Sequence, residues 1–349
     1  SRILGWDRGF DEFYDFMDIL KGPSAFVTKQ QSEGLFGKIL RFAGGALGAG
    51  RRSSIQRLLK KVYYKFSGMN LPYLEGKELN RYVIDWVEKN SDKKFFLWMH
   101  YMDPHDPYAP PEEYLTYFSS RKEALDYSLS VNPDNLSNEE LITLKRLYEG
   151  EVKYTDDSIG TFLNYLRERD LLDDSIIILT GDHGHAFMEH GRFGHAYDIL
   201  YNEVIHVPLI LFGVNERKKI DTEVQLLDVA PTILDLLGIE RPRSFIGRGL
   251  LRERDTSIPI FSESAKPDLI NLKYDMSKKV VSCIKDGMKL IINELQGTRE
   301  LYDLKKDFSE RNNLIEYEKE VFAQLFSIVN SHINEIFTSK VKSKTCLLY

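Results

Sequence analysis

The sequence predicts an α/β fold: a predominantly parallel central sheet with helices on both faces, followed by a small C-terminal α+β part. Short apolar runs alternate with amphipathic helical stretches between residues 75 and 237, which is typical of a parallel sheet covered by helices. From about residue 277 the pattern changes to short strands joined by a turn signal. With 42% hydrophobic and 12% aromatic residues, the 349-residue chain can bury a substantial core.

The elements of the α/β part follow from periodicity. Apolar residues at helical spacing indicate amphipathic helices, and short continuous apolar runs indicate buried strands. The last of the helices carries Pro231 in its first turn, where a missing amide is tolerated, and it ends at Gly238. We expect helices at 75–90, 138–170 and 228–237 and strands at 94–101, 175–180 and 207–212.

The C-terminal part is predicted from a hairpin signal. Asp286 and Gly287 lie between the apolar runs 279–284 and 288–293, and an Asp-Gly pair between two such runs favours a tight β-turn. A final helix is expected at about 316–337. We therefore expect two domains, an α/β domain at residues 1–275 and an α+β subdomain at 276–349.

Charge, hydropathy and cysteine content exclude several classes of protein. The chain has 47 basic and 53 acidic residues, a net charge of −6, which has the wrong sign for a nucleic-acid binder. No apolar run approaches the roughly 18 residues of a transmembrane segment. Two cysteines, Cys283 and Cys346, supply no disulfide framework and suit a reducing compartment, so we expect a cytoplasmic location.

A basic insertion covers residues 34–66, which contain eight lysines and arginines and no acidic residue. Its second half has apolar residues at helical spacing, with most of the basic residues off that stripe. Such a helix could make a peripheral contact with an anionic membrane or guard an anionic substrate. It could equally be an ordinary surface helix that packs its apolar stripe against the protein.

Histidines gather after one of the predicted strands. Five of the eight lie between His183 and His206, directly after the apolar strand that ends at Thr180. Ligands bind beyond the carboxyl ends of parallel strands, so Asp182 and His183 could ligate a divalent cation there. The alternative is that Asp182 caps the following turn and His183 packs.

A second candidate follows the predicted strand 94–101. His105 lies between Pro104 and Pro107, which we expect to hold the backbone extended and the imidazole in a fixed direction. An imidazole so placed can protonate a leaving group or bind an anionic oxygen. The alternative is a loop histidine bonded to the backbone. The acids Asp103 and Asp106 are interpreted as turn residues.

Six short segments follow one another in a characteristic order and spacing. They are FFLWMHYMDPHDPY at 95–108, LTGDHG at 179–184, EHGRFGH at 189–195, YNEVIHVPLI at 201–210, LDVAPTIL at 227–234 and ELYDLKKD at 300–307. Together these segments resemble the sulfatase family of the alkaline phosphatase superfamily. The resemblance extends over about residues 5–315, and it implies an alkaline phosphatase-like fold.

The resemblance assigns roles to individual residues. It implies that Asp182 and His183 are metal ligands for a divalent cation, usually calcium, although the imidazole also suits manganese or zinc. It implies that His105 and His195 are catalytic: His105 contacts the sulfate and protonates the leaving oxygen, and His195 touches the same anion. His190 is a weaker candidate, whereas packing or support is expected of the two remaining histidines of the cluster, His185 and His206.

The family's nucleophile is a formylglycine made from Cys or Ser in a Cys/Ser-x-Pro-x-Arg motif. This motif and the family's paired N-terminal acids do not occur in the sequence, so we expect a fragment that lacks the N-terminal catalytic portion and hydrolyses negligibly alone. The expected function of the parent is metal-dependent hydrolysis of a sulfate ester, carried by a small molecule or glycan. The alternatives are a phosphodiester or phosphonate monoester hydrolase on the same scaffold, and a noncatalytic anion-binding protein.

Overall fold

The computed structural model describes residues 9–14, 73–214, 217, 219–251, 258–268 and 273–342. The chain forms two compact units, Ser1–Asp174 and Ser175–Tyr349. The basic insertion 34–66 lies outside the described residues, so the membrane contact considered for it stays a prediction. The domain boundary after residue 275 also stays a prediction.

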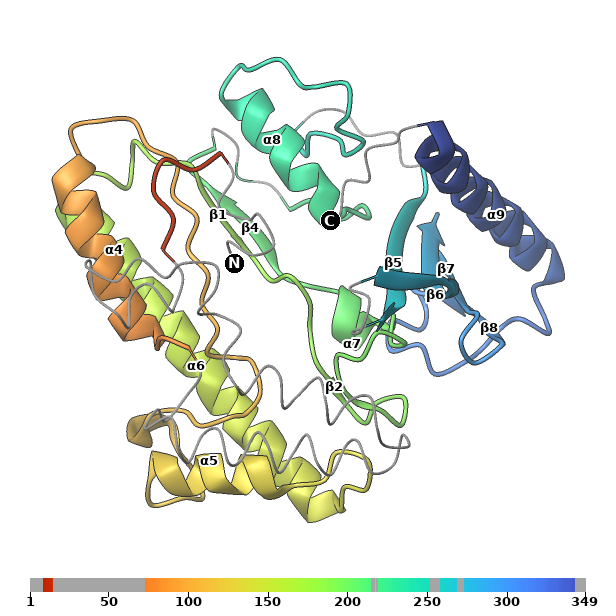
Figure 1. The fold of residues 1–349 in the computed structure, drawn as a ribbon, viewed down its shortest axis with the longest axis horizontal. Helices are drawn as coiled ribbons and strands as arrows, with labels where there is room; N and C mark the ends of the chain where they lie inside the picture. Colours follow the sequence, from red (N-terminus) through yellow and green to blue (C-terminus); the bar gives the residue numbers. More distant parts are fainter. Residues whose placement is uncertain are drawn as a thin grey trace. The chain divides into compact units, whose positions relative to one another are not determined.

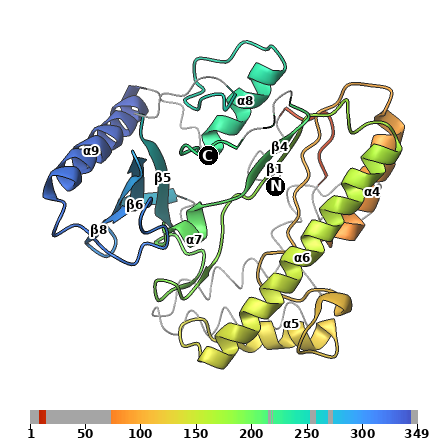
Figure 2. The same cartoon turned by 180° about the vertical axis from the view of Figure 1, so that it is seen from behind.

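The first unit is built on two helices that pack along each other, α4 (Gly76–Asn90) and α6 (Asn138–Glu168), as both views show (Figures 1 and 2). Ser137 begins α6 with a capping box, in which its hydroxyl accepts from the amide of Glu140. The unit also contains the short helix η2 (Glu112–Tyr114) and α5 (Arg121–Ser130). The helices predicted at 75–90 and 138–170 are confirmed.

The buried strand predicted at 94–101 is wrong, because this segment is neither a strand nor buried. Phe96 is 64% exposed and Trp98 is 55% exposed. A strand needs a hydrogen-bonded neighbour, and no strand in the described part of the chain pairs with this segment. The ring of Phe10 lies against it instead, 5.9 Å from the ring of Phe96 and 6.2 Å from that of Trp98.

In the second unit, β1 (Ile177–Thr180) and β4 (Leu209–Phe212) confirm the two predicted strands, but they pair antiparallel, with Ile177 opposite Phe212. The direction of this pair differs from the predominantly parallel sheet that the sequence predicts, while the combination of helices and sheets confirms the α/β class. A parallel connection needs a crossover, usually a helix. The chain between them makes only the hairpin of β2 (Ala186–Phe187) and β3 (Phe193–Gly194) and the one-turn helix α7 (Asn202–Ile205).

The rest of the second unit contains α8 (Val229–Leu236), preceded by η3 (Leu226–Asp228), and a four-stranded antiparallel sheet. The helix predicted at 228–237 is confirmed. The sheet has the order β5 (Ile260–Asp268), β6 (Lys273–Lys285), β7 (Met288–Asn293) and β8 (Thr298–Asp303). Asp286 and Gly287 both adopt positive φ between β6 and β7, which confirms the predicted hairpin.

The sheet β5–β8 carries apolar side chains on both faces. One face packs against α9 (Lys319–Lys342), which lies beside the sheet in both views (Figures 1 and 2) and confirms the predicted final helix. Alternate residues of the same strands point the other way and pack against Leu200 and its neighbours. The sheet therefore supports the segment that leads into α7, next to the histidine-bearing hairpin.

No helix among the described residues combines the length and the apolar character that crossing a bilayer requires.

Candidate functional site

The loop that carries His105 is a turn in the first unit. The His105 amide donates to the carbonyl oxygen of Met102 at 2.9 Å, and its own carbonyl accepts from the Tyr73 hydroxyl at 3.5 Å. Its Nδ1 lies 2.6 Å from the carbonyl oxygen of Asp106. The prolines thus frame a turn and not the extended segment expected from the sequence, and the histidine is oriented through one ring nitrogen.

Two fully buried acids hold this loop on the helices. Asp103 Oδ1 accepts from the amide of Gly76, the first residue of α4, at 3.1 Å. Glu151 on α6 accepts from the amide of Ala109 through Oε1 at 2.7 Å. Asp103 was predicted to be a turn residue, and the structure shows that it also satisfies an otherwise unpaired amide at a helix N-terminus.

These acids are short of compensating charge. Burial raises the pKa of Asp103 to about 6 and that of Glu151 to about 8. Among the described residues, Asp103 Oδ2 and Glu151 Oε2 have no hydrogen-bond partner. Arg121 donates to the carbonyl of Ala109 at 2.5 Å and pairs with Glu75, and its charge opposes both shifts. Near pH 7 these pKa values leave Glu151 largely neutral and Asp103 largely ionised.

In the second unit, Asp182 and His183 follow β1. Asp182 Oδ1 accepts from the His183 amide at 2.9 Å, and His183 Nδ1 lies 2.9 Å from the carbonyl oxygen of Gly184. Because a carbonyl only accepts, Nδ1 carries the proton, and in the neutral ring Nε2 then holds the lone pair. His183 Nε2 lies 3.8 Å from Asp182 Oδ2, and the Asp182 side chain is 73% exposed.

This donor pair fits a divalent cation. A carboxylate oxygen and an imidazole nitrogen with a free lone pair lie side by side and open to solvent. The oxygen suits calcium, and the nitrogen suits manganese or zinc. The two residues would supply part of a coordination sphere.

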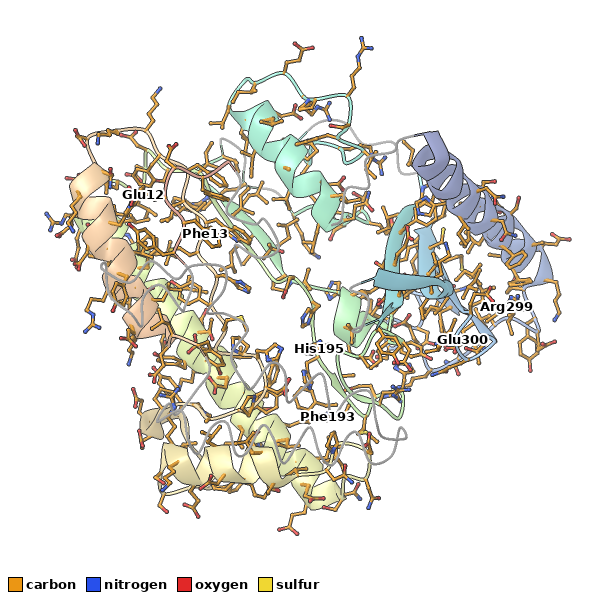
Figure 3. The ribbon with its side chains drawn as sticks, viewed as in Figure 1. Glu12, Phe13, Phe193, His195, Arg299 and Glu300 are labelled. Atoms are coloured by element: carbon orange, nitrogen blue, oxygen red, sulfur yellow. The ribbon has the colours of Figure 1, made fainter. Side chains whose placement is uncertain are left out.

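His195, immediately after β3, lies against the same group. The His195 ring stacks on the ring of His183 with centroids 4.3 Å apart. His195 and Phe193 are both labelled in Figure 3. His185 packs 4.8 Å from the ring of Phe187 and 4.9 Å from that of Phe193. The structure thus brings together three of the predicted site residues, with His185 in contact with aromatic rings beside them.

The glycine after His183 is required by packing. A Cβ on Gly184 would overlap the carbonyl oxygen of Glu203, and the Gly184 amide donates to the carbonyl of Val204 at 2.7 Å. The turn that carries the candidate ligands therefore lies directly on α7.

The other histidines of the cluster make internal contacts. His190 Nδ1 lies 2.7 Å from Glu203 Oε1, and His206 packs its ring 5.0 Å from that of Phe308. Glu203 was not singled out from the sequence, because an acid in a short helix carries no signal of a partner 13 residues away. Glu151 did carry a signal, since it falls within the apolar stripe of its helix.

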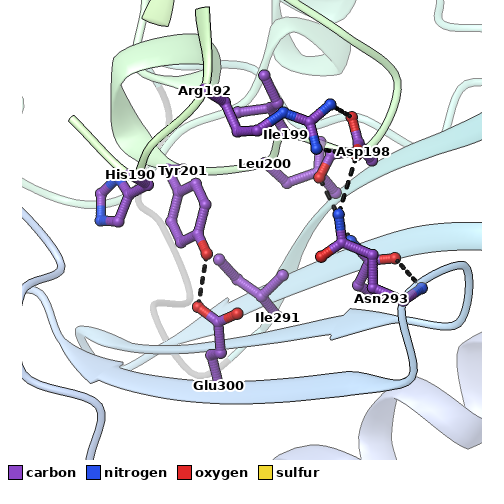
Figure 4. Close-up of a pocket in the computed structure, with 10 residues that line it drawn as sticks. His190, Arg192, Asp198, Ile199, Leu200, Tyr201, Ile291, Asn293 and Glu300 are labelled. Atoms are coloured by element: carbon purple, nitrogen blue, oxygen red, sulfur yellow. Dashed lines mark hydrogen bonds and ion pairs between the residues drawn. The ribbon is translucent and has the colours of Figure 1, made fainter. Parts of the chain in front are cut away.

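A cavity of about 110 Å³ lies beside the hairpin (Figure 4). Arg192 on its wall pairs with Asp198 at 2.7 Å, and Gln296 donates to the same carboxylate at 3.0 Å. The Tyr201 hydroxyl donates to Glu300 at 2.7 Å. These polar groups form hydrogen bonds and ion pairs with one another, and they connect the hairpin to the residues beneath it.

Comparison with known proteins identifies the family of this arrangement. The family model described as Sulfatase matches residues 7–239. A second model, described as N-sulphoglucosamine sulphohydrolase, C-terminal, matches residues 188–338.

Curated relatives and solved structures agree with this match. The chain is 27% identical over 280 residues to an arylsulfatase of Clostridium perfringens, covering 70% of the chain and 56% of the relative. It is 25% identical over 252 residues to the uncharacterized sulfatase YidJ of Escherichia coli, covering 67% and 50%. The phosphonate monoester hydrolase of Agrobacterium radiobacter shares its fold, with a TM-score of 0.59, 18% identity and coverage of 76% and 63%. The chain spans about half the length of these curated relatives.

Proposed function

The chain belongs to the sulfatase family, and from this premise we propose that it serves the metal-dependent hydrolysis of a sulfate ester. One observation carries the proposal: His183 and His195 stack with ring centroids 4.3 Å apart, beside the exposed carboxylate of Asp182. The proposed cation ligands and the proposed anion-binding imidazole therefore lie close together in the second unit. A sulfate ester needs both, because its nonbridging oxygens concentrate negative charge.

Each residue has a proposed task. Asp182 and His183 would hold the cation, which when bound would draw charge from the ester oxygens. His195 donates a hydrogen bond to the anion. His105, oriented through Nδ1 in its own loop, gives a proton to the leaving oxygen.

The finer chemistry is also part of the proposal. We propose calcium as the cation, because the exposed Asp182 carboxylate is a hard oxygen donor. We propose formylglycine as the nucleophile and a sulfated small molecule or glycan as the substrate, in keeping with the relatives named as arylsulfatase and the family model named for N-sulphoglucosamine. Treating the natural protein with a carbonyl-reactive hydrazide tests the nucleophile, since an aldehyde forms a hydrazone.

The metal site can be tested on the chain itself with Mn²⁺, a paramagnetic stand-in for the cation. We expect Mn²⁺ to broaden the ring signals of His183 and His195 before those of His332, which lies on α9. Asp182→Asn should abolish the selective broadening, whereas Asp173→Asn, an exposed acid before β1, should leave it intact. Equal broadening of all three histidines would overturn the assignment.

A phosphonate or phosphodiester hydrolase is the second candidate, favoured by the shared fold of the phosphonate monoester hydrolase. Aryl sulfate and aryl phosphonate substrates with the same phenol leaving group separate the two. We expect the natural protein to prefer the sulfate, and preference for the phosphonate would replace the first proposal. Binding of sulfate without turnover would support a noncatalytic anion-binding protein.

A further inference from the structure

His190, at the tip of the hairpin, has an acceptor at each ring nitrogen. Nδ1 lies 2.7 Å from Glu203 Oε1, and Nε2 lies 2.9 Å from the carbonyl oxygen of Glu310. The ring stacks on Tyr201 with centroids 3.7 Å apart, and the side chain is only 12% exposed. A neutral imidazole has one N–H and one lone pair, so it can satisfy only one of these two oxygens.

We propose that His190 carries a proton on both ring nitrogens and, by tying the hairpin tip to the segment after β8, acts as a positioning residue for His195. The importance of His195 rests on the proposed function. The protonation state and the tie rest on the contacts of His190 alone.

Glu310, whose carbonyl oxygen faces His190, is itself held by several contacts. The Glu310 carboxylate is fully buried with Lys289 Nζ 2.6 Å away, and it accepts from the Asn202 amide at 2.6 Å. Arg311 makes a parallel tie, because its guanidinium donates to the carbonyl of Glu189 at 2.6 Å. The carbonyl that faces His190 therefore belongs to a segment that is anchored to both β7 and α7.

The hairpin tip that carries His190 is connected through one short strand to His195. The hairpin has a single short ladder, closed by the Met188 amide donating to the carbonyl of Arg192 at 2.8 Å. His195 follows the second strand of this ladder, and its ring stacks on His183. Because so few hydrogen bonds hold the hairpin, the contacts at its tip fix the direction from which His195 approaches His183.

Charged groups near His190 come from the hairpin, β7, α7 and β8. From the hairpin side, Arg192 is already paired with Asp198, and from β7 Lys289 is paired with Glu310. From α7 and β8, Glu203 and Glu300 both contribute negative charge, Glu300 through its bond with Tyr201 (Figure 4). Among the described residues, the basic group in contact with Glu203 is the ring of His190.

His332 provides a matched control within the same unit. Its ring stacks on Phe261 with centroids 3.8 Å apart, and its Nε2 lies 2.6 Å from Glu263. In the described part of the chain its Nδ1 has no hydrogen-bond partner. The two histidines therefore share a stacked ring and a glutamate, and differ in the second acceptor.

The protonation state is tested with the full chain labelled with ¹⁵N in its histidine rings. In spectra recorded at about pH 7.5 we expect two N–H signals from His190, because both of its ring nitrogens face acceptors, and a nitrogen with a free lone pair in His332. A single protonated nitrogen in His190 at that pH would overturn the proposal, whatever the function of the chain.

The positioning role is tested with His190→Gln and His190→Asn, each of which retains at most one of the two bonds. We expect both variants to shift the ring signals of His183 and His195, and His332→Gln to leave them unchanged. Unshifted signals in a folded variant would overturn the role. If both variants fail to fold, Glu203→Gln removes the negative acceptor and should cost His190 its second N–H signal. Failure of the Mn²⁺ experiment alone would contradict the proposed function and leave this inference standing.

Discussion

The two units fix their histidine-bearing loops with buried acids of different charge. In the first unit, Asp103 and Glu151 bond to backbone amides, and burial raises the pKa of Glu151 to about 8. In the second unit, Glu310 is paired with Lys289 in a site where both side chains are fully buried. Burial there raises the pKa of the Glu310 carboxyl and lowers that of Lys289, and their mutual attraction opposes both shifts.

The two units therefore stabilise a buried acid in two different ways. A neutral carboxyl can accept an amide hydrogen bond at little electrostatic cost, so the first unit needs no buried cation at Glu151. Glu310 accepts from the Asn202 amide and also contacts an ammonium, so it is stable as a carboxylate only while the cation is present. The first cluster should therefore respond to pH, and the second to loss of a partner.

The largest expected effect is the loss of Lys289. In Lys289→Met, the Glu310 carboxylate stays buried without its cation, and we expect a loss of about 3–5 kcal/mol in the free energy of unfolding. Urea unfolding at neutral pH measures it. The double variant Lys289→Met with Glu310→Gln should recover most of the loss, and an equal loss in both variants would show that charge compensation is not the cause.

The next effect concerns pH. The pKa of Glu151 is raised from an ordinary 4.5 to about 8, so its stabilising contribution is complete below pH 4.5 and is lost as the pH rises towards 8. Glu151→Gln removes this loss, and we expect it to be more stable than the unaltered chain by on the order of 2 kcal/mol at alkaline pH. Urea unfolding across this range checks it, with the exposed Glu149→Gln as control. Parallel pH curves for Glu151→Gln and the unaltered chain would contradict the charge assignment.

For Asp103 we expect a pH dependence of the free energy of unfolding that has the same direction and a smaller magnitude. Burial raises its pKa from 3.8 to about 6, so its contribution is lost between these values and the loss is complete at neutral pH. We expect Asp103→Asn to gain about 1 kcal/mol at pH 7 relative to its difference at pH 4, measured by urea unfolding. A neutral-pH gain larger than that of Glu151→Gln at alkaline pH would reverse the proposed order of the two acids.

The smallest expected effect distinguishes the buried acids Asp103 and Glu151 from the helix α6, on which Glu151 lies. Gly160 lies on α6 with open space where a Cβ would be, so Gly160→Ala should stabilise the helix by about 0.5–1 kcal/mol. Because Gly160 is no part of the acid cluster, thermal unfolding should show this gain equally at pH 5 and pH 8. A gain that changed with pH would indicate that the pH response belongs to the helix as a whole.

Local patterns predicted much of the fold. The helix α4 follows from apolar spacing within its own segment, and the hairpin between β6 and β7 follows from Asp286 and Gly287. The segment 94–101 and the direction of pairing between β1 and β4 were mispredicted. Both depend on which distant strand supplies the hydrogen bonds, and an apolar run carries no information about its partner.

The candidate site divides in the same way. Asp182, His183 and His195 were predicted from histidine clustering and the resemblance, and the structure places their side chains together in the second unit. The tie from His190 to Glu310 spans 120 residues of sequence, and nothing near either residue indicates the other.

The sequence alone determined the sulfatase resemblance, the helices with clear apolar stripes and the residue types that suit a cation and an oxyanion. These are properties of short segments, because helix spacing, turn residues and ligand chemistry act over a few neighbours. Only the tertiary structure decided that Glu151 is a buried acid with a raised pKa that accepts a hydrogen bond from the amide of Ala109. It also decided that the His190 ring faces two acceptors. Burial and opposing charge come from distant segments, and they set the state of a side chain that its own neighbours leave open.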